Sequence, residues 1–581
     1  MTLNLHSRAA AIERMTSDEP LDVLVIGGGV VGGGIALDAV TRGLSTGLIE
    51  ARDYSSGTSS RSSKLIHGGL RYLEMLDFGL VHEALQERGL LLTKVAPHLV
   101  RPVPFMYPLS KPAWERFYVG SGIALYDGLA FGVRQTGGMP RHRHLRKKNA
   151  LQLMPSLKPS VLSGAIQYYD AQVDDARFVL ELVRTAAQHG AHVANRVKAE
   201  ELIRDDDGRV VGVVAVDDTV PASDPAGRVT IRAKHVISAT GVWTDEIQAM
   251  LGEDGPLQVA ASKGVHLVVP KDRIDSQTGV ILRTSKSVLF IIPWDDHWII
   301  GTTDTPWKYD RQHPSATSAD IDYLLDTVNE VLVTPLSRDD IDGVFVGLRP
   351  LIAPSDLERD APDGVEATTK ISREHVVASP VPGLVLVAGG KYTTYRVMAK
   401  DALDLALADL GKDMPEAITE TVPLAGAIGW EWLSERPHIL ARGSDVDLLD
   451  IENLLERYGT LVKELLALIA VDPTLGELLP GGESHLKAEI VYAAACEGAL
   501  HLTDALTRRT RISIEARDRG LSAAEPAARL MAPILGWDED RIHYEIDLYR
   551  RRVEAEMSSQ TMPDDESSNQ ARSAVRETTL S

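Results

Sequence analysis

Residues 21–72 read LDVLVIGGGVVGGGIALDAVTRGLSTGLIEARDYSSGTSSRSSKLIHGGLRY. The short apolar run at 23–26 is typical of a buried strand, and the apolar, alanine-rich segment after the glycines predicts a helix. A second apolar run ends at Glu50. The order strand, glycine turn, helix and strand predicts a βαβ unit at the start of an α/β domain. The turn carries three glycines at the spacing GxGxxG: Gly27, Gly29 and Gly32.

Each of these glycines has a physical role in binding a nucleotide. The first permits a tight turn, the second lets a pyrophosphate approach the backbone, and the third lets the helix pack closely on the strand. The pyrophosphate then lies at a helix N-terminus, where unpaired N–H groups and the helix dipole favour anions. Glu50 follows Gly27 by 23 residues and can accept both hydroxyls of an adenosine ribose. The pattern therefore predicts a dinucleotide-binding site.

Length and composition exclude several classes of protein. The chain has 581 residues, 44% of them hydrophobic and 25% charged, which is typical of a globular protein of two to four domains. A net charge of −21 argues against non-specific nucleic-acid binding, and no nucleic-acid partner is predicted. The one cysteine, Cys496, cannot form an intramolecular disulfide or a cysteine metal cluster. We predict no metal site.

The two ends of the chain differ from its middle. Residues 1–20 are expected to form a polar N-terminal arm. A helical periodicity dominates 425–556 and predicts a separate helical domain. The tail at 557–581 has no periodic apolar pattern, so we expect it to be disordered. Residues 51–72 are rich in serine and glycine and suit a loop that wraps a polar ligand.

The sequence places the protein in the cytoplasm, with at most a peripheral membrane contact. The N-terminus lacks the apolar core of a signal peptide, and no apolar run reaches the roughly 18 residues of a membrane span. Residues 141–148 read RHRHLRKK, a basic cluster in an acidic chain. Two interpretations remain open: a solvated loop, or contact with anionic lipid headgroups beside the apolar segment 113–132.

Nine runs, counting DVLVIGGGVVGGGIALDA of the opening stretch, are similar to FAD-dependent glycerol-3-phosphate dehydrogenases, in the order found in that family and over about residues 20–520. The most specific are SSKLIHGGLRYLE and GGKYTTYR, which separate this family from amine and D-amino-acid oxidases. The others include YYDAQVDDAR, SATGVWTD, KGVHLVVP, IGTTDT, GLRPL and RRTRISIE. Tyr392 departs from the leucine that is usual in GGKLTTYR, which makes the local substrate geometry a question for the structure.

The resemblance implies an α/β fold. Its FAD domain resembles those of glutathione reductase and D-amino-acid oxidase, and an interleaved substrate domain carries an antiparallel sheet. A helical C-terminal domain follows. Within an oxidoreductase region at 21–410, the FAD domain is expected from about 21–95, 165–260 and 370–410. The substrate domain is expected from about 96–164 and 261–369.

The resemblance also implies a reaction and its partners. sn-Glycerol 3-phosphate is oxidised to dihydroxyacetone phosphate, FAD takes the hydride, and a membrane quinone reoxidises the flavin. A homodimer at the inner face of the plasma membrane is expected. An oxidase that passes electrons to oxygen is the close alternative. The net negative charge of the chain and the cationic site residues argue against a flavin-binding regulatory or RNA-modifying protein. The later glycine-rich segments suit a ligand as long as FAD and so argue against an NAD-dependent enzyme.

The resemblance assigns five substrate contacts: Arg71, Tyr72, His266, Arg349 and Lys391. The chemistry of these side chains agrees, because arginine binds a phosphate bidentately and lysine supplies a point charge. His266 is a natural base for the alcohol proton. Arg349 could instead stabilise a developing alkoxide, and Lys391 could favour negative charge on the reduced ring or the substrate oxygen. His266, Arg349 and Lys391 are the predicted catalytic residues.

The predicted FAD contacts extend from the glycine turn to the second half of the chain. Val197 is expected to act through its backbone beside the adenine. The full set is Gly27, Gly29, Gly32, Glu50, Thr58, Ser59, Ser62, Lys64, Leu65, Val197, Gly241 and Thr394.

Overall fold

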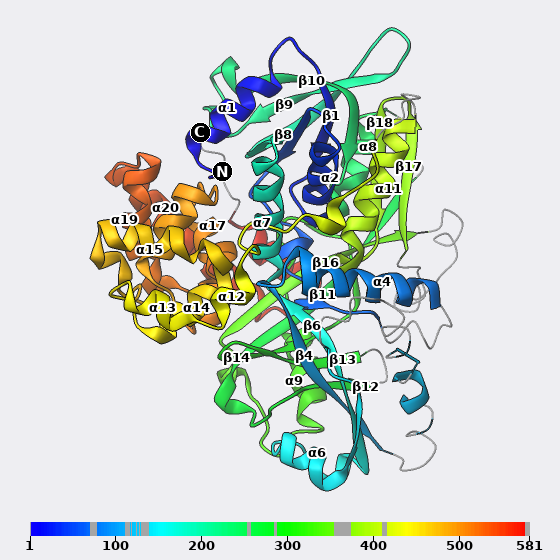
Figure 1. Ribbon diagram of the computed structural model, residues 1–581, viewed down its shortest axis with the longest axis vertical. Helices are drawn as coiled ribbons and strands as arrows, with labels where there is room; N and C mark the ends of the chain where they lie inside the picture. The colour runs from blue at the N-terminus through cyan, green and yellow to red at the C-terminus, as the bar shows by residue number, and fades with distance from the viewer. Residues whose placement is uncertain are drawn as a thin grey trace.

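A computed structural model describes residues 2–69, 78–110, 117, 119–123, 125–126, 128, 139–252, 257–283, 288–353, 374–408 and 415–575. Figure 1 shows two sheets, one above the other, with a group of helices to one side of them. Most of the predicted apolar segment 113–132 lies outside the described residues.

The upper sheet has eight strands among the described residues, and its centre is parallel in the order β18-β10-β1-β2-β7. Edge strand β17 pairs with β18 in the antiparallel sense, as do β8 and β9 with each other. The strands are β1 (Leu21–Ile26), β2 (Thr46–Glu50), β7 (His192–Asn195), β8 (Val197–Arg204), β9 (Val210–Asp217), β10 (Arg228–Ser238), β17 (His375–Val381) and β18 (Leu384–Gly389).

Both faces of this sheet are covered, which explains the near-continuous apolar runs of its strands. Three helices share a core with β1 and β18: α2 (Val30–Thr41), α7 (Asp175–Gln188) and α11 (Tyr395–Ala408). Asp174 caps α7 by accepting hydrogen bonds from the N–H groups of Ala176 and Arg177. Two further helices are α4 (Phe78–Leu90) and α8 (Thr244–Ala249).

The lower sheet has ten strands among the described residues, all paired antiparallel except β12 with β4. Helices α6 (Lys147–Leu153) and α9 (Ser318–Asn329) cover one face through a shared apolar core. The strands are β3 (Leu65–Ile66), β4 (Val100–Leu109), β5 (Arg143–Arg146), β6 (Gly164–Val173), β11 (Gln258–Pro270), β12 (Gly279–Arg283), β13 (Val288–Trp294), β14 (His297–Gly301), β15 (Thr305–Trp307) and β16 (Gly343–Ala353).

One predicted boundary is wrong. The segment from 165 was assigned to the FAD domain, yet β6 belongs to the lower sheet, where it pairs with β4 from Val100 to Leu109. Strand β3, from the predicted ligand loop, pairs with β6 as well. Strand periodicity reports which side chains are buried but not which strand is the partner, so the sequence alone misplaced this segment.

The helical domain packs against the flank of both sheets and has two apolar cores of its own. Its interior helices carry buried leucine, isoleucine and alanine at helical spacing. The helices are α12 (Trp430–Ser434), α13 (Pro437–Arg442), α14 (Leu448–Tyr458), α15 (Val462–Val471), α16 (Lys487–Cys496), α17 (Leu502–Asp504), α18 (Ile512–Glu515), α19 (Leu521–Leu535), α20 (Glu539–Ser559) and α21 (Asp565–Ser573).

The structure corrects the prediction of a disordered tail and adds a helix to the polar N-terminal arm. The polar arm contains helix α1 (Leu5–Met15), which buries Met15 and ion-pairs Arg8 with Asp217 at 2.6 Å. The tail is ordered through residue 575: α20 continues to Ser559 and α21 follows. Both segments are held mainly by polar contacts and few apolar ones, which an apolar periodicity does not reveal.

In the described part of the chain, every helix is too short or too polar to cross a bilayer.

Candidate active site

One large cavity lies between the two sheets and has a volume of about 1020 Å³. This is at the upper end of the roughly 300–1,000 Å³ of typical ligand pockets. Most predicted site residues line it, although they come from segments that are hundreds of residues apart in sequence. Those residues are Gly27, Gly29, Glu50, Thr58, Ser59, Ser62, Leu65, Val197, Gly241, His266, Arg349 and Lys391.

The glycine turn has the shape that a diphosphate requires. Gly27 has a φ of +113°, and a Cβ there would lie 2.7 Å from the carbonyl oxygen of Ala239. A Cβ on Gly32 would lie 1.8 Å from the carbonyl oxygen of Gly27, so only glycine permits this approach of helix and strand. Gly29 is the N-cap of α2, which leaves the helix N-terminus facing the cavity. An anion is favoured there by the helix dipole.

Glu50 is oriented by the backbone at the end of β2. Its Oε2 accepts a hydrogen bond from the N–H of Gly28 at 2.6 Å, and its Oε1 accepts one from the N–H of Arg52 at 2.9 Å. A carboxylate has about four acceptor positions, so two remain for ribose hydroxyls. The oriented acid, the glycine turn and the size of the cavity together fit the adenosine diphosphate half of FAD.

Residues 58–65 of the predicted ligand loop lie against the cavity, but several of their polar groups already bond to other parts of the protein. The Ser59 hydroxyl accepts from the N–H of Val30 at 3.1 Å, which places it at the start of α2. Thr58 donates to the carbonyl of Leu348 at 2.7 Å. Ser62 donates through both its N–H and its hydroxyl to Asp175. The loop is therefore held in place before any ligand binds.

Three predicted FAD residues do not line the cavity. Lys64 is fully buried and ion-pairs with Asp175 at 2.8 Å. Thr394 is 2% exposed and donates to the carbonyl of Lys391 at 3.5 Å. Gly32 acts through helix packing, as described above. Lys64 and Thr394 thus support the cavity wall from behind.

His266 lies on β11 and is 3% exposed. Its ring stacks on Phe345 with centroids 4.6 Å apart, and its Nε2 lies 2.8 Å from the Ser63 hydroxyl. Its Nδ1 has no hydrogen-bond partner within the described segments. Burial holds the pKa of His266 well below its ordinary value, and the cations Arg349 and Lys64 lower it further. The imidazole is therefore neutral at pH 7 and can accept a proton.

Arg349 lies on β16, opposite Ser262 of β11. Its guanidinium contacts Asp304 at 3.4 Å and donates to the Thr302 hydroxyl and the Thr303 carbonyl, both at 3.2 Å. The Arg349 side chain is 24% exposed, whereas that of Asp304 is 6% exposed. The carboxylate therefore holds the arginine from inside while part of the guanidinium faces the cavity.

Lys391 follows two glycines at the end of β18. Gly389 and Gly390 have φ values of +74° and +77°, and a Cβ on Gly390 would lie 2.4 Å from the sulfur of Met398. These glycines turn the chain so that Lys391 reaches the cavity. The neighbouring Tyr392 donates its hydroxyl to the carbonyl of Asp175 at 2.7 Å, which ties this turn to the start of α7.

The two remaining predicted substrate residues, Arg71 and Tyr72, lie outside the described residues.

Comparisons with known proteins agree with this geometry. Residues 22–396 match the family described as FAD dependent oxidoreductase, and residues 417–542 match the C-terminal domain of alpha-glycerophosphate oxidase. The glycerol-3-phosphate dehydrogenase of Mycobacterium leprae is 52% identical, over 99% of this chain and 95% of its own length. The mitochondrial glycerol-3-phosphate dehydrogenase of Arabidopsis thaliana is 35% identical, over 96% and 90%.

A solved structure also matches at full length. The glycerol-3-phosphate dehydrogenase from Bacillus halodurans, complexed with FAD, has a TM-score of 0.74 and 28% identity, covering 94% of this chain and 97% of that one. The chain belongs to the FAD-dependent glycerol-3-phosphate dehydrogenases. Its cofactor is FAD, and its place is in glycerol metabolism.

Sequence reasoning missed several residues of the dehydrogenase site. Ser63 contacts His266, while Thr302 and Asp304 hold Arg349. Thr302 and Asp304 lie in the IGTTDT run, so the resemblance contained a signal for them. Asp175 is another such residue, because it binds Lys64 and also Arg511 of the helical domain.

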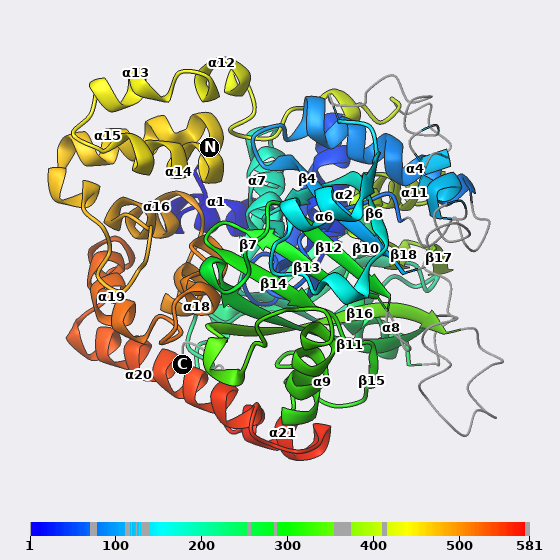
Figure 2. The same ribbon diagram turned by 90° about the horizontal axis from the view of Figure 1, so that it is seen from below.

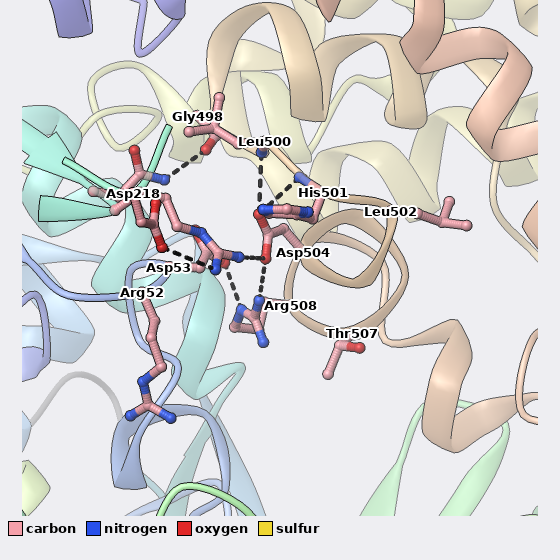
Figure 3. A network of polar contacts seen from close by, with 12 residues as sticks. Arg52, Asp53, Asp218, Gly498, Leu500, His501, Leu502, Asp504, Thr507 and Arg508 are labelled. Atoms are coloured by element: carbon pink, nitrogen blue, oxygen red, sulfur yellow. Dashed lines mark hydrogen bonds and ion pairs between the residues drawn. The ribbon is translucent and has the colours of Figure 1, made fainter. Parts of the chain in front are cut away.

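The helical domain reaches the cofactor side of the dehydrogenase through a second polar network (Figure 3). Asp504 accepts hydrogen bonds from the N–H groups of Leu500 and His501 and from Arg508. Arg508 in turn contacts Asp53 at 2.5 Å, close to the cavity residue Arg52. This network anchors the helical domain beside the end of the cavity that holds Glu50 and Val197.

Proposed function

We propose that this dehydrogenase oxidises sn-glycerol 3-phosphate to dihydroxyacetone phosphate and passes the electrons to a membrane quinone. The observation that carries the reaction is the meeting of His266, Arg349 and Lys391 in one cavity with the dinucleotide-binding turn. A cationic pair beside a neutral base suits an anionic alcohol.

His266 is proposed as the base that takes the proton from the substrate hydroxyl. It is neutral because of burial and nearby cations, and its Nδ1 is without a partner in the described part of the chain. Ser63 and Phe345 fix the orientation of the ring. A bound phosphate dianion would partly offset the nearby cations, which would raise the pKa of His266 toward the range in which a general base is effective.

Arg349 and Lys391 are proposed to hold the anionic oxygens of the substrate, together with Arg71 and Tyr72. Asp304 and Thr302 fix the fork of Arg349, so its remaining donors meet the substrate without a large loss of side-chain entropy. The cavity residues that would hold FAD are those of the glycine turn, Glu50, the 58–65 loop, Val197 and Gly241. When bound there, FAD supplies the acceptor for the hydride from C2.

Anaerobic flavin reduction tests this function. Glycerol 3-phosphate should bleach the flavin band at about 450 nm, whereas free glycerol at the same concentration should not. Equal bleaching by both compounds would show that the cations do not select a phosphate.

A glycerol-3-phosphate oxidase is the second candidate, because residues 417–542 match a domain described for an alpha-glycerophosphate oxidase. The two candidates differ in their electron acceptor. Peroxide formed in equal amount to the substrate consumed, with no activity toward a soluble quinone analogue, would establish the oxidase.

A peripheral contact with anionic lipid is proposed for the basic cluster at 141–148, which would bring the enzyme to its quinone. Five cationic side chains of this cluster are exposed: Arg141, Arg143, Arg146, Lys147 and Lys148. Each contributes about 1 kcal/mol near an anionic surface. Neutralising the five should abolish sedimentation with phosphatidylglycerol vesicles, and unchanged sedimentation would remove this role.

A cytoplasmic homodimer bound to the inner face of the plasma membrane is proposed as the working form. Light scattering on the purified protein tests the oligomeric state, since a single mass near 63.2 kDa would exclude the dimer. Cell fractionation tests the location.

A further inference from the structure

The C-terminal helix α21 lies beyond the segment that matches the C-terminal family domain, which ends at residue 542. Figure 2 shows α20 running along the lower edge of the view, with α21 following it below α9. We propose that α21 is a brace for the segment 302–318 and, through it, for Arg349. Asp565, Ser568 and Asn569 are then positioning residues for the oxidation of glycerol 3-phosphate.

Direct hydrogen bonds join the tail to the C-terminal half of this segment, residues 310–318. Met562 accepts through its carbonyl from the N–H of Ser318 at 2.8 Å. Ser568, which is fully buried, donates to the carbonyl of Ala316 at 3.0 Å. Asn569 accepts from the N–H of Asp310 at 3.3 Å. Because these contacts involve the backbone of the segment, they set its position whatever its side chains do.

An ion-pair cluster joins the tail to the sheet itself. Lys263 of β11 is 1% exposed and pairs with Asp320 of α9 at 2.6 Å and with Asp565 of α21. Side chains alternate along a strand, so Lys263 points away from the cavity that Gly264 and His266 line. The cluster therefore lies directly behind the catalytic face of β11.

The N-terminal half of the segment, which begins at Thr302, forms one wall of the active site. Thr302 and Asp304 line the cavity and hold Arg349. Asp304 also accepts a hydrogen bond from Ser262 of β11. The short strand β15 links this half to the braced half and pairs with β11 at Lys263. A displacement of the braced half is thus transmitted to the carboxylate that orients Arg349.

The expected consequence is a loss of substrate binding with retention of FAD. The braced segment carries Thr302 and Asp304, which hold Arg349. It also contacts the FAD side through Arg311, which donates to the carbonyl of Val242, but the glycine turn and Glu50 adjoin strands of the upper sheet, which α21 does not brace. A misplacement of about 1 Å far from the reacting atoms can cost about 100-fold in rate. This inference rests on the role proposed for Arg349.

The test compares the holoenzyme with the double variant Asp565→Asn/Asn569→Ala. The KM for glycerol 3-phosphate should rise about tenfold, while kcat falls less than about threefold and the flavin content stays at that of the parent. Asp547→Asn is the matched control, because Asp547 is an exposed, ion-paired acid on α20. In the same Asn569→Ala background, Asp565→Glu keeps the carboxylate that pairs with Lys263 and should return KM part of the way to the parental value.

Each outcome decides one part of the inference. An unchanged KM in the double variant, with or without a lower melting temperature, overturns the brace, since the tail is then structural only. A rise in KM that Asp565→Glu does not reverse removes the ion pair from the mechanism. Arg349→Ala is measured in parallel. If Arg349→Ala also leaves KM unchanged, the proposed substrate site is wrong. If it alone raises KM, that site stands and the brace does not.

Discussion

Gly264 offers a sharp test of Arg349, because the nearest protein atoms that a methyl group there would meet belong to Arg349 and Thr302. A Cβ on Gly264 would lie 2.7 Å from a terminal nitrogen of Arg349 and 2.7 Å from the Thr302 hydroxyl. Ordinary contact begins at 3.4 Å, so the guanidinium must retreat by about 0.7 Å (3.4 − 2.7). The arginine can move, since it is the far end of a flexible side chain, and the protein should still fold.

The magnitude follows from that displacement. A misplacement of about 1 Å can cost about 100-fold in rate, so about 0.7 Å should lower kcat/KM by about 10- to 100-fold, which is about 1.4–2.7 kcal/mol. We expect Gly264→Ala to retain its FAD and its melting temperature to within a few degrees. Steady-state kinetics and anaerobic flavin reduction with glycerol 3-phosphate measure the loss.

Gly443→Ala is the control for Gly264→Ala. A Cβ at Gly443 would meet its nearest atoms at 3.6 Å, which is ordinary contact, and the residue ends α13 far from the cavity in sequence and fold. If Gly264→Ala keeps kcat/KM within about twofold of the parent, Arg349 does not contact the substrate in the way proposed here.

Three further predictions address the base, the cofactor and the domain contact. Because the pKa of His266 is depressed, kcat/KM should stay flat as pH falls to about 6.5 and decline only at lower pH; a decline centred above 7 would contradict the neutral imidazole. Glu50→Gln should weaken FAD about 10- to 150-fold, since it converts an acceptor of two ribose hydroxyls into a partial donor; flavin release in urea measures it, and unchanged release would refute it. Asp175→Asn should lower the free energy of unfolding by about 3–5 kcal/mol, because Lys64 and Arg511 lose a buried counter-charge. Calorimetry measures this loss, and a change below about 1 kcal/mol would show that other groups neutralise the two cations.

The sequence alone determined the nucleotide-binding half of this protein. The order of strand, GxGxxG turn, helix and acid is local, and local geometry is what spacing encodes: Gly27, Gly32 and Glu50 occupy the positions that the spacing predicts. Motifs also identified His266, Arg349 and Lys391 as site residues, and the tertiary structure brings all three to one cavity.

Only the tertiary structure showed which residues hold the site residues in place and that segments near both chain ends are ordered. Strand β6 joined the lower sheet by pairing with β4, from Leu109 opposite Gly164 to Val100 opposite Val173. Helices α1 and α21 became ordered through contacts with residues 200 or more positions away. Ser63, Asp304 and Asp175 gained their roles in the same way. A buried polar group acquires its partner only when distant segments meet in the fold. The free energy of those pairings depends on burial, which no local pattern of residues specifies.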